Sequence, residues 1–263
     1  MSCPVPRVLR HVLLTALLAV SAWVIAAEPM ARPKVLATAK PSGWGVRQIL
    51  VANPKSPRVL LIGDSILTGY HAKAAELLRG KVNLDVWVTW KHIGCQDLPA
   101  DIKAIFGEHS YDVILFNDIG LHAWEPGRIP QGQYDPLLRA HLANLRKFAP
   151  HAKLIFASTT PMTTTTRPIA LDPEFNPVIV ERNKIAVKIM AENHVPIADY
   201  YGLLAAKPHL AAGDRFHWTK PAYELLAQLA ATRVAEALGF SRSATPSVPP
   251  GLGREKGAGR GDH

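Results

Sequence analysis

Five short apolar runs, separated by longer segments with helical spacing, constrain the fold of this chain more than any other feature. Runs of this length that are rich in branched apolar residues are typical of parallel strands buried on both faces. The alternation of strands and helices predicts an α/β fold with helices on both faces of the sheet. The five predicted strands cover residues 58–62, 85–89, 112–116, 153–157 and 195–198.

The segments between these runs carry helix signals. Apolar residues recur at helical spacing over residues 134–148, with Asp135 as the expected N-cap. Asn176-Pro177 begins another helix, and residues 219–238 form the last one, which Gly239 closes. We therefore expect a flavodoxin-like three-layer α/β/α sandwich around a parallel sheet of about five strands.

The first 27 residues have the pattern of a secretory signal peptide. Arg7 and Arg10 precede an apolar stretch over residues 12–25, and Ala26-Ala27 offers small residues for cleavage. A membrane anchor is the competing interpretation, but the stretch is shorter than the roughly 18 residues that a span requires. We expect a cleaved leader, a secreted or periplasmic protein, and no stable membrane insertion after cleavage.

The remaining sequence divides into three parts. Residues 28–57 are expected to be an N-terminal extension, residues 58–240 the single folded domain, and residues 241–263 a disordered tail rich in Gly, Pro, Ser and Arg. Without the leader, Cys95 is the only cysteine, so no internal disulfide is expected. A lone cysteine is more often a small buried apolar residue than a nucleophile.

The net charge does not indicate nucleic-acid binding. The formal charge of the chain is +9, and about +5 remains on residues 28–240 after the two leader arginines and the net two positive charges of the tail are left out. The remaining basic residues are scattered and do not alternate with aromatic residues as they do along a nucleic-acid backbone. We expect no nucleic-acid partner.

Chemistry is indicated by Gly63-Asp64-Ser65 at the end of the first strand and by Asp214 and His217 near the C-terminus. A serine hydroxyl becomes a nucleophile at neutral pH when a histidine takes its proton, and a carboxylate fixes the tautomer of that histidine. We expect Ser65, His217 and Asp214 to be these three groups.

Two further segments follow strands and fall at the same edge of a parallel sheet, where open α/β sheets bind ligands. Attack on an ester creates an oxyanion, which needs hydrogen-bond donors. The expected donors are the backbone N–H groups of Ser65 and Gly94 and the side-chain amide of Asn117.

These residues resemble the four blocks of the SGNH, or GDSL-type, hydrolase family. The blocks are Gly63-Asp64-Ser65-Ile66, Ile93-Gly94, Phe116-Asn117-Asp118 and Asp214-Arg215-Phe216-His217, and the resemblance spans residues 58 to about 238. It implies a nucleophile at Ser65, oxyanion donors at Gly94 and Asn117, and an acid–base pair of Asp214 and His217.

The chain departs from the family pattern at two positions. Leu115 replaces a glycine usual two positions before the asparagine, and Trp218 replaces a proline that often follows the histidine. Both departures concern the shape of the pocket. The Gly-x-Ser-x-Gly elbow of α/β-hydrolases is absent, because Leu67 occupies the second glycine position.

Other residues near these blocks are candidates for substrate binding. His122, Trp124 and Trp218 lie beside the expected site residues, and an indole ring can stack on a sugar, although packing in the core is the common role of such a ring. The histidines lack the spacing of a metal site, so we expect no metal and no cofactor.

The sequence therefore predicts a serine esterase that removes an acyl group, acetyl above all, from a small-molecule or polysaccharide ester outside the cytoplasm. A lipase, a thioesterase or an O-acetyltransferase would use the same triad. A carbohydrate-binding protein that kept the fold and lost catalysis is the alternative from another class. The acyl chain length, the alcohol part and the oligomeric state stay open.

Overall fold

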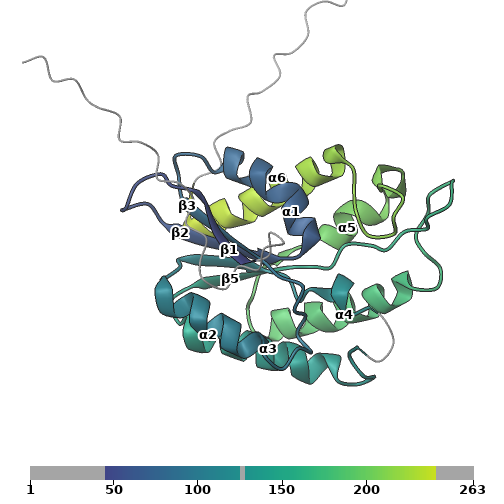
Figure 1. The fold of residues 1–263 in the computed structure, drawn as a ribbon, viewed down its shortest axis with the longest axis horizontal. Helices are drawn as coiled ribbons and strands as arrows, with labels where there is room; N and C mark the ends of the chain where they lie inside the picture. The colour runs from purple at the N-terminus through teal and green to yellow at the C-terminus, as the bar shows by residue number, and fades with distance from the viewer. Residues whose placement is uncertain (1–44, 125–127, 241–263) are drawn as a thin grey trace, which may run out of the picture. The chain divides into compact units, whose positions relative to one another are not determined.

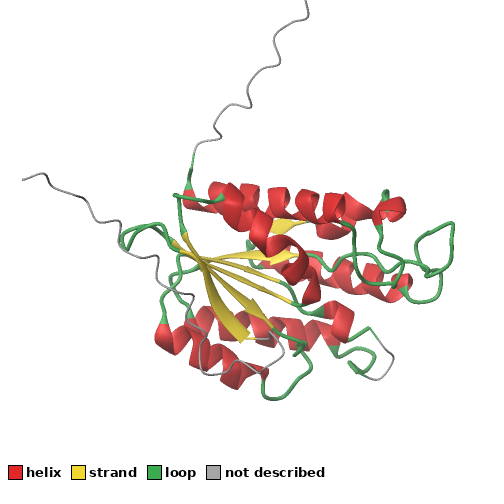
Figure 2. Cartoon of the chain, turned by 45° about the horizontal axis from the view of Figure 1, so that its top comes forward, coloured by secondary structure: helices red, strands yellow, loops and turns green. Residues whose placement is uncertain are grey.

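The computed structural model describes residues 45–124 and 128–240. A sheet of six strands lies between two layers of helices (Figures 1 and 2), which confirms the expected three-layer α/β/α fold. The expected leader, most of the N-terminal extension and the tail lie outside the described residues. The strands, in the spatial order β1-β3-β2-β4-β5-β6, are β1 (Gly45–Leu50), β3 (Asn83–Val88), β2 (Arg58–Gly63), β4 (Val113–Phe116), β5 (Lys153–Ala157) and β6 (Ile197–Ala198).

Side chains of each central strand alternate between two apolar cores. In β2, Val59 and Leu61 join the core on one face of the sheet, whereas Leu60 and Ile62 join the core on the other. Both faces are buried, which explains why these strands are continuously apolar. One face is covered by α1 (Ser65–Leu77), α5 (Tyr200–Ala205) and α6 (Lys220–Leu238), and the other by α2 (Leu98–Glu108), α3 (Tyr134–Phe148) and α4 (Asn176–Glu192).

The strand β1 was not expected from the sequence. It pairs antiparallel with β3 at the edge of the sheet, while the other five strands are parallel. Its sequence, GVRQIL, has two polar residues, Arg47 and Gln48, at its centre, so it lacks the continuous apolar run of a strand buried on both faces. The expected domain start at residue 58 therefore leaves out a strand that belongs to the sheet.

The structure tests the expected helix ends. The start of α4 at Asn176 and the end of α6 at Gly239, whose φ is 72°, are confirmed. The expected cap at Asp135 is wrong, because α3 begins one residue earlier and Gln133 occupies the N-cap position. Asp135 instead accepts a hydrogen bond of 2.6 Å from Arg139 one turn later. A salt bridge between neighbouring turns competes with capping for the same carboxylate.

The carboxyl ends of the parallel strands place the functional segments at one edge of the sheet. β2 leads directly into α1, β4 leads into the loop 117–124, and β5 leads into the loop 158–175. The turn 211–218 precedes α6 and reaches the same edge, since His217 contacts Ser65 there. In the described ranges, no helix has the length and apolar character that crossing a membrane requires.

His141 is an unusual residue in the core beneath the sheet. Its side chain is buried against Phe116, and neither ring nitrogen has a hydrogen-bond partner within the described part of the chain. Burial lowers the pKa of His141 from 6.5 to about 4. Below pH 6.5 the unfolded chain binds a proton at this histidine, whereas the folded chain does not until the pH approaches 4. The free energy of unfolding therefore falls as the pH falls from 6.5 towards 4.

We predict that His141→Leu removes this loss of stability. Between pH 7.5 and 4.5 the wild-type protein should lose roughly 2 to 3 kcal/mol more free energy of unfolding than the variant, from the size of the pKa difference. Urea denaturation at both pH values measures this. Equal losses in the two proteins would show that protonated His141 is stabilised by a hydrogen-bond acceptor and that its pKa is not lowered in the folded protein.

Candidate active site

Ser65 occupies the sharp junction between β2 and α1. Gly63 ends the strand, and a Cβ at this position would lie 2.8 Å from the Cβ of Leu67, so only glycine fits without a shift. Asp64 is the N-cap of α1, and its Oδ1 accepts a hydrogen bond of 2.9 Å from the N–H of Ile66. Strand, glycine and cap together fix Ser65 as the first residue of the helix.

His217 and Asp214 lie on a short turn before α6. The Oδ1 atom of Asp214 accepts hydrogen bonds from the backbone N–H groups of Phe216, at 3.1 Å, and His217, at 2.8 Å. An isolated bridge between Ala211 and Trp218 closes the base of the turn. An aspartate that binds the backbone two and three residues later is a usual stabiliser of such turns.

The three expected groups meet in one hydrogen-bonded row. The Nδ1 atom of His217 lies 2.7 Å from Oδ2 of Asp214, and its Nε2 atom lies 2.9 Å from Oγ of Ser65. Residues separated by 152 positions in the sequence are thus joined. The chemistry assigns the role of each ring nitrogen. A carboxylate can only accept, so Nδ1 carries the hydrogen and donates to Asp214, and Nε2 accepts a hydrogen bond from the serine hydroxyl.

The carboxylate of Asp214 is held in its charged form. Its partial burial would raise the pKa, but hydrogen bonds from the backbone and the imidazole of His217 and from the N–H of Phe216 outweigh burial and lower it. The side chains of His217 and Asp214 remain 40% and 52% exposed. The pair therefore faces solvent, where a large substrate could reach it.

The expected oxyanion donors differ in what they already bind. The N–H of Ser65 lies in the first turn of α1, where a helix supplies no acceptor. The N–H of Gly94 donates to Nδ1 of His92 at 3.1 Å. Burial, followed by nearby positive charges, lowers the pKa of His92 and favours the neutral ring, in which one nitrogen can accept a hydrogen bond.

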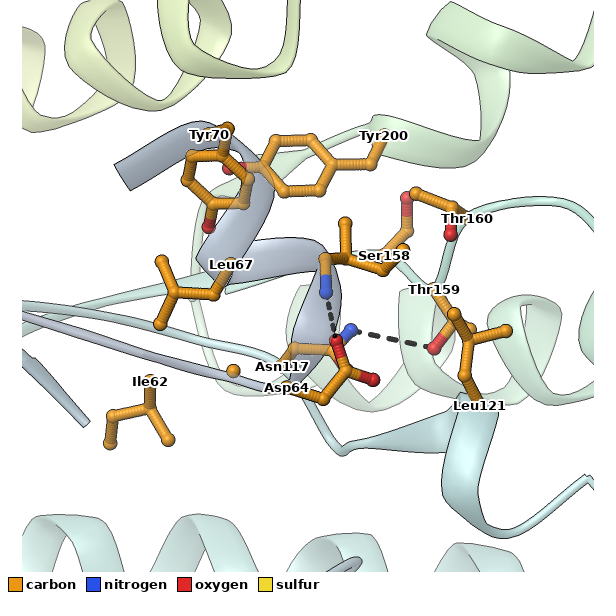
Figure 3. Close-up of a pocket in the computed structure, with 12 residues that line it drawn as sticks. Ile62, Asp64, Leu67, Tyr70, Asn117, Leu121, Ser158, Thr159, Thr160 and Tyr200 are labelled. Carbon is orange, nitrogen blue, oxygen red and sulfur yellow. Dashed lines mark hydrogen bonds between the residues drawn. The ribbon is translucent and has the colours of Figure 1, made fainter. Parts of the chain in front are cut away.

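Asn117 uses both ends of its side chain within the protein. Its Nδ2 donates to the carbonyl of Ala157 at 2.7 Å and lies 3.4 Å from Oγ1 of Thr159 (Figure 3), while its Oδ1 accepts from the N–H of Ile119 at 2.7 Å. The contact with Thr159 is at the long end of hydrogen-bond distances, so the second amide hydrogen is weakly held. Donation from Asn117 to an oxyanion stays a prediction.

Two buried carboxylates, Asp64 and Asp118, lie under the site and accept hydrogen bonds from neighbouring groups. Burial, only partly offset by the bond from Ile66, raises the pKa of Asp64 to about 6. The Oδ2 atom of Asp64 lies 3.9 Å from Nε2 of His122. Asp118 binds the hydroxyls of Tyr134 at 2.7 Å and Thr159 at 2.9 Å. These bonds tie the loop after β4 to the rest of the sheet edge.

A small cavity lies behind the start of α1 (Figure 3). Its volume is about 20 Å³, and Asp64, Asn117, Leu121, Thr160 and Tyr200 are among its lining residues. This volume suits about one water molecule. The cavity is therefore no channel for a long acyl chain.

The expected substrate-binding residues have different positions. His122 is half-buried beside Asp64, and burial, followed by the charges of Arg128 and His217, lowers its pKa. Trp124 is half-buried, with its ring 4.5 Å from the ring of Phe175. The expectation for Trp218 is wrong, because its side chain is only 3% exposed and packs in the core, so it offers no ring face to a sugar.

Sequence reasoning missed two residues beside the hydrogen-bonded row of Ser65, His217 and Asp214. Phe175 lies before α4 and contacts Trp124, and Arg215 lies between Asp214 and Phe216 with its guanidinium 4.6 Å from the centre of the Phe175 ring. Phe175 carries no motif, but Arg215 lies within the Asp-x-x-His block. Within the described ranges, no three His, Cys, Asp or Glu side chains gather in a way that could hold a metal ion.

Solved structures of other proteins share this fold. An acetyl xylan esterase, AlAXEase, aligns with a TM-score of 0.56 and 17% identity over 67% of this chain and 99% of its own. An acetylxylan esterase from Geobacillus stearothermophilus aligns with 0.54 and 16% over 72% and 97%, and an alpha/beta hydrolase from the metagenome of Lake Arreo, Spain, with 0.53 and 16% over 70% and 95%.

Comparison of the sequence with protein-family models and with curated proteins finds no match. Identities of 15–17% to the solved structures establish a common fold and leave the chemistry to be argued from the residues of this chain. What the comparisons show is therefore that this chain has the mixed α/β fold of known esterases.

Proposed function

We propose that the protein is a serine esterase of SGNH type that removes an acyl group, acetyl above all, from a carbohydrate. One observation carries this proposal: the row of hydrogen bonds from Ser65 Oγ through the imidazole of His217 to the carboxylate of Asp214. Nucleophilic acyl transfer by a serine needs three parts. They are a serine hydroxyl, a histidine nitrogen that accepts a hydrogen bond from it, and a charged carboxylate that binds the other nitrogen of the histidine.

In the proposed reaction, Ser65 Oγ attacks the ester carbonyl while His217 Nε2 takes its proton. The carbonyl π-bond opens to an oxyanion, and Asp214 stabilises the imidazolium through Nδ1. When the oxyanion collapses, the bond to the alcohol breaks and His217 returns the proton to the leaving alcohol. Water, deprotonated by the same histidine, then releases the acid and restores Ser65.

The N–H of Ser65 is the best-placed donor for the oxyanion, because it is the first N–H of α1, for which the helix supplies no acceptor, and the helix dipole there favours negative charge. The N–H of Gly94 and the weakly held second hydrogen of Asn117 complete the proposed set. Both would have to share or exchange their present acceptors as charge develops.

Two features support a short acyl group on a large alcohol. The half-exposed side chains of His217 and Asp214 leave room for a polysaccharide, and the cavity behind α1 is too small for a long acyl chain. The proteins of similar fold include acetyl xylan esterases. His122 and Trp124 are the side chains we propose for contact with the substrate, and the reaction needs no cofactor.

The place of action is a proposal from the sequence. The leader over residues 1–27 supports a secreted or periplasmic enzyme, where acylated polysaccharides are accessible. A lipase, an O-acetyltransferase or a non-catalytic carbohydrate-binding protein would each give a different result in the test that follows, and a thioesterase would hydrolyse an acyl thioester faster than the matching oxygen ester.

We predict that a fluorophosphonate probe labels Ser65 and that p-nitrophenyl acetate is hydrolysed faster than its longer-chain homologues. Peptide mass spectrometry locates the label, and release of acetate from acetylated xylan, pectin and peptidoglycan identifies the alcohol. Faster hydrolysis of long-chain esters would indicate a lipase, and transfer of acetate to an added sugar would indicate a transferase. A protein that is not labelled and hydrolyses no ester would contradict the proposal.

The triad makes a prediction about non-additivity. Ser65→Ala and His217→Ala should each lower kcat by roughly 10³-fold or more, and the double variant should lose little beyond either one, because the two groups act as a unit. Steady-state kinetics on p-nitrophenyl acetate measures this, with thermal unfolding as the control for folding. Losses that multiply in the double variant would mean that the two residues act separately.

Asn117 allows a separate test of the oxyanion site. Asn117→Asp keeps the Oδ1 acceptor for Ile119 but removes the amide donor, so kcat should fall by about 10²-fold or more while KM changes little. Both Asn117→Asp and Asn117→Ala lose the hydrogen bond to the carbonyl of Ala157, so thermal unfolding of each variant is the control for folding. An increase in KM at unchanged kcat would assign Asn117 to ground-state binding.

A further inference from the structure

We propose that Arg215 is a positioning residue that holds the Asp214–His217 turn against Ser65 by clamping it to the segment before α4. This inference rests on the proposed function, because it concerns the geometry of the proposed acid–base pair. It starts from an asymmetry between the two halves of the site. Ser65 is fixed between a buried strand and a helix, whereas Asp214 and His217 lie half-exposed on a turn.

The turn has few contacts of its own. Asp214 Oδ1 binds two backbone N–H groups inside the turn, and the N–H of Ala212 donates to the carbonyl of His217 at 2.9 Å. These bonds shape the turn but do not connect it to the strand that carries Ser65. Trp218, buried in the core, anchors the C-terminal end of the turn. The part that carries Asp214 needs a further anchor outside the turn to keep the hydrogen bond to Ser65 at 2.9 Å.

Arg215 supplies that anchor through three contacts with one neighbouring segment. Its guanidinium stands 4.6 Å from the centre of the Phe175 ring, and its Nη1 atom lies 3.6 Å from Oδ2 of Asp172. Its carbonyl accepts a hydrogen bond of 3.0 Å from the N–H of Thr163. The backbone of Arg215 thus contacts the loop between β5 and α4 at Thr163, and its side chain contacts the end of the same loop at Asp172 and Phe175.

The anchoring segment is itself well ordered by internal bonds. Asp172 has a side chain only 7% exposed, and its Oδ1 accepts from the N–H groups of Glu174 and Phe175, each at 3.0 Å. Its second oxygen is the one that faces Arg215. One carboxylate therefore fixes the entry to α4 with one oxygen and faces the triad turn with the other.

The backbone of Arg215 also indicates a specific requirement. Its φ is 82°, in the left-handed region that a residue with a Cβ rarely adopts. Such a conformation persists when surrounding contacts over-determine it. Glycine would adopt it without strain, so the presence of arginine there points to a gain from its side chain.

The experiment compares Arg215→Gly, Arg215→Lys and Asp172→Asn with the wild-type protein. Glycine keeps the backbone conformation and removes the clamp, lysine keeps the charge but loses the planar contact with Phe175, and asparagine keeps the Oδ1 acceptor while removing the charge that faces Arg215. Arg233→Ala is the matched control, because Arg233 forms a comparable ion pair with Glu236 on α6 at 2.9 Å.

For Arg215→Gly we expect kcat on p-nitrophenyl acetate to fall roughly 10- to 100-fold with KM almost unchanged, since small displacements of catalytic groups have effects of this size. The rate of fluorophosphonate labelling should fall by the same factor. Arg215→Lys and Asp172→Asn should lie between Arg215→Gly and the wild type, and Arg233→Ala should equal the wild type.

Hydrogen exchange of the peptide covering residues 211–218 gives a readout that does not depend on activity. Exchange should be faster in Arg215→Gly than in the wild type and unchanged in Arg233→Ala. Unchanged exchange together with unchanged kcat would overturn the proposal. A rise in KM for an acetylated xylo-oligosaccharide with normal kcat on p-nitrophenyl acetate would also overturn it and make Arg215 a substrate contact. If the wild-type protein hydrolyses no ester, the proposed function fails, while the exchange data still decide whether Arg215 anchors the turn.

Discussion

The hydrogen bond of 2.9 Å between His217 and Ser65 is the interaction on which the proposed chemistry depends, and most of the fold can be understood as what keeps it in place. Ser65 is held there by the buried parallel strand β2 and the capped helix α1. His217 lies much later in the sequence, on the turn that leads into α6. Because α1 and α6 cover the same face of the sheet, the start of α1 and the turn before α6 meet at the carboxyl edge of the sheet.

Buried polar groups at this edge stabilise the backbone that carries the site. Asp64 caps the helix that begins with Ser65, Asp118 joins two hydroxyls beneath the loop after β4, and Asp172 orders the segment before α4. Asp118 and Asp172 each accept several hydrogen bonds, as a charge removed from water requires, whereas the carboxylate of Asp64 accepts one, from Ile66. At Asp64, next to Ser65, burial outweighs this compensation and raises the pKa to about 6.

The three residues of the proposed triad could be predicted from the sequence because strand, glycine and serine follow one another directly, and because Asp214 and His217 lie three positions apart. The strand β1 could not, since an edge strand with polar residues lacks the pattern of burial. Asp135 and Trp218 were misjudged for a related reason: local sequence does not reveal a competing partner such as Arg139 or the depth of a ring in the core. Arg215 was missed because its partners, Asp172 and Phe175, are distant in sequence and carry no motif.

The different attachment of the two halves of the site has a consequence for heat inactivation. Ser65 shares the stability of β2 and α1, which are packed into the core. The half-exposed part of the turn, between the buried residues Ala211 and Trp218, depends on its own hydrogen bonds and on a few contacts with one loop. Local opening of such a segment requires less free energy than global unfolding. Warming should therefore separate histidine from serine while the sheet is still intact, so that activity is lost reversibly at temperatures below the melting of the fold.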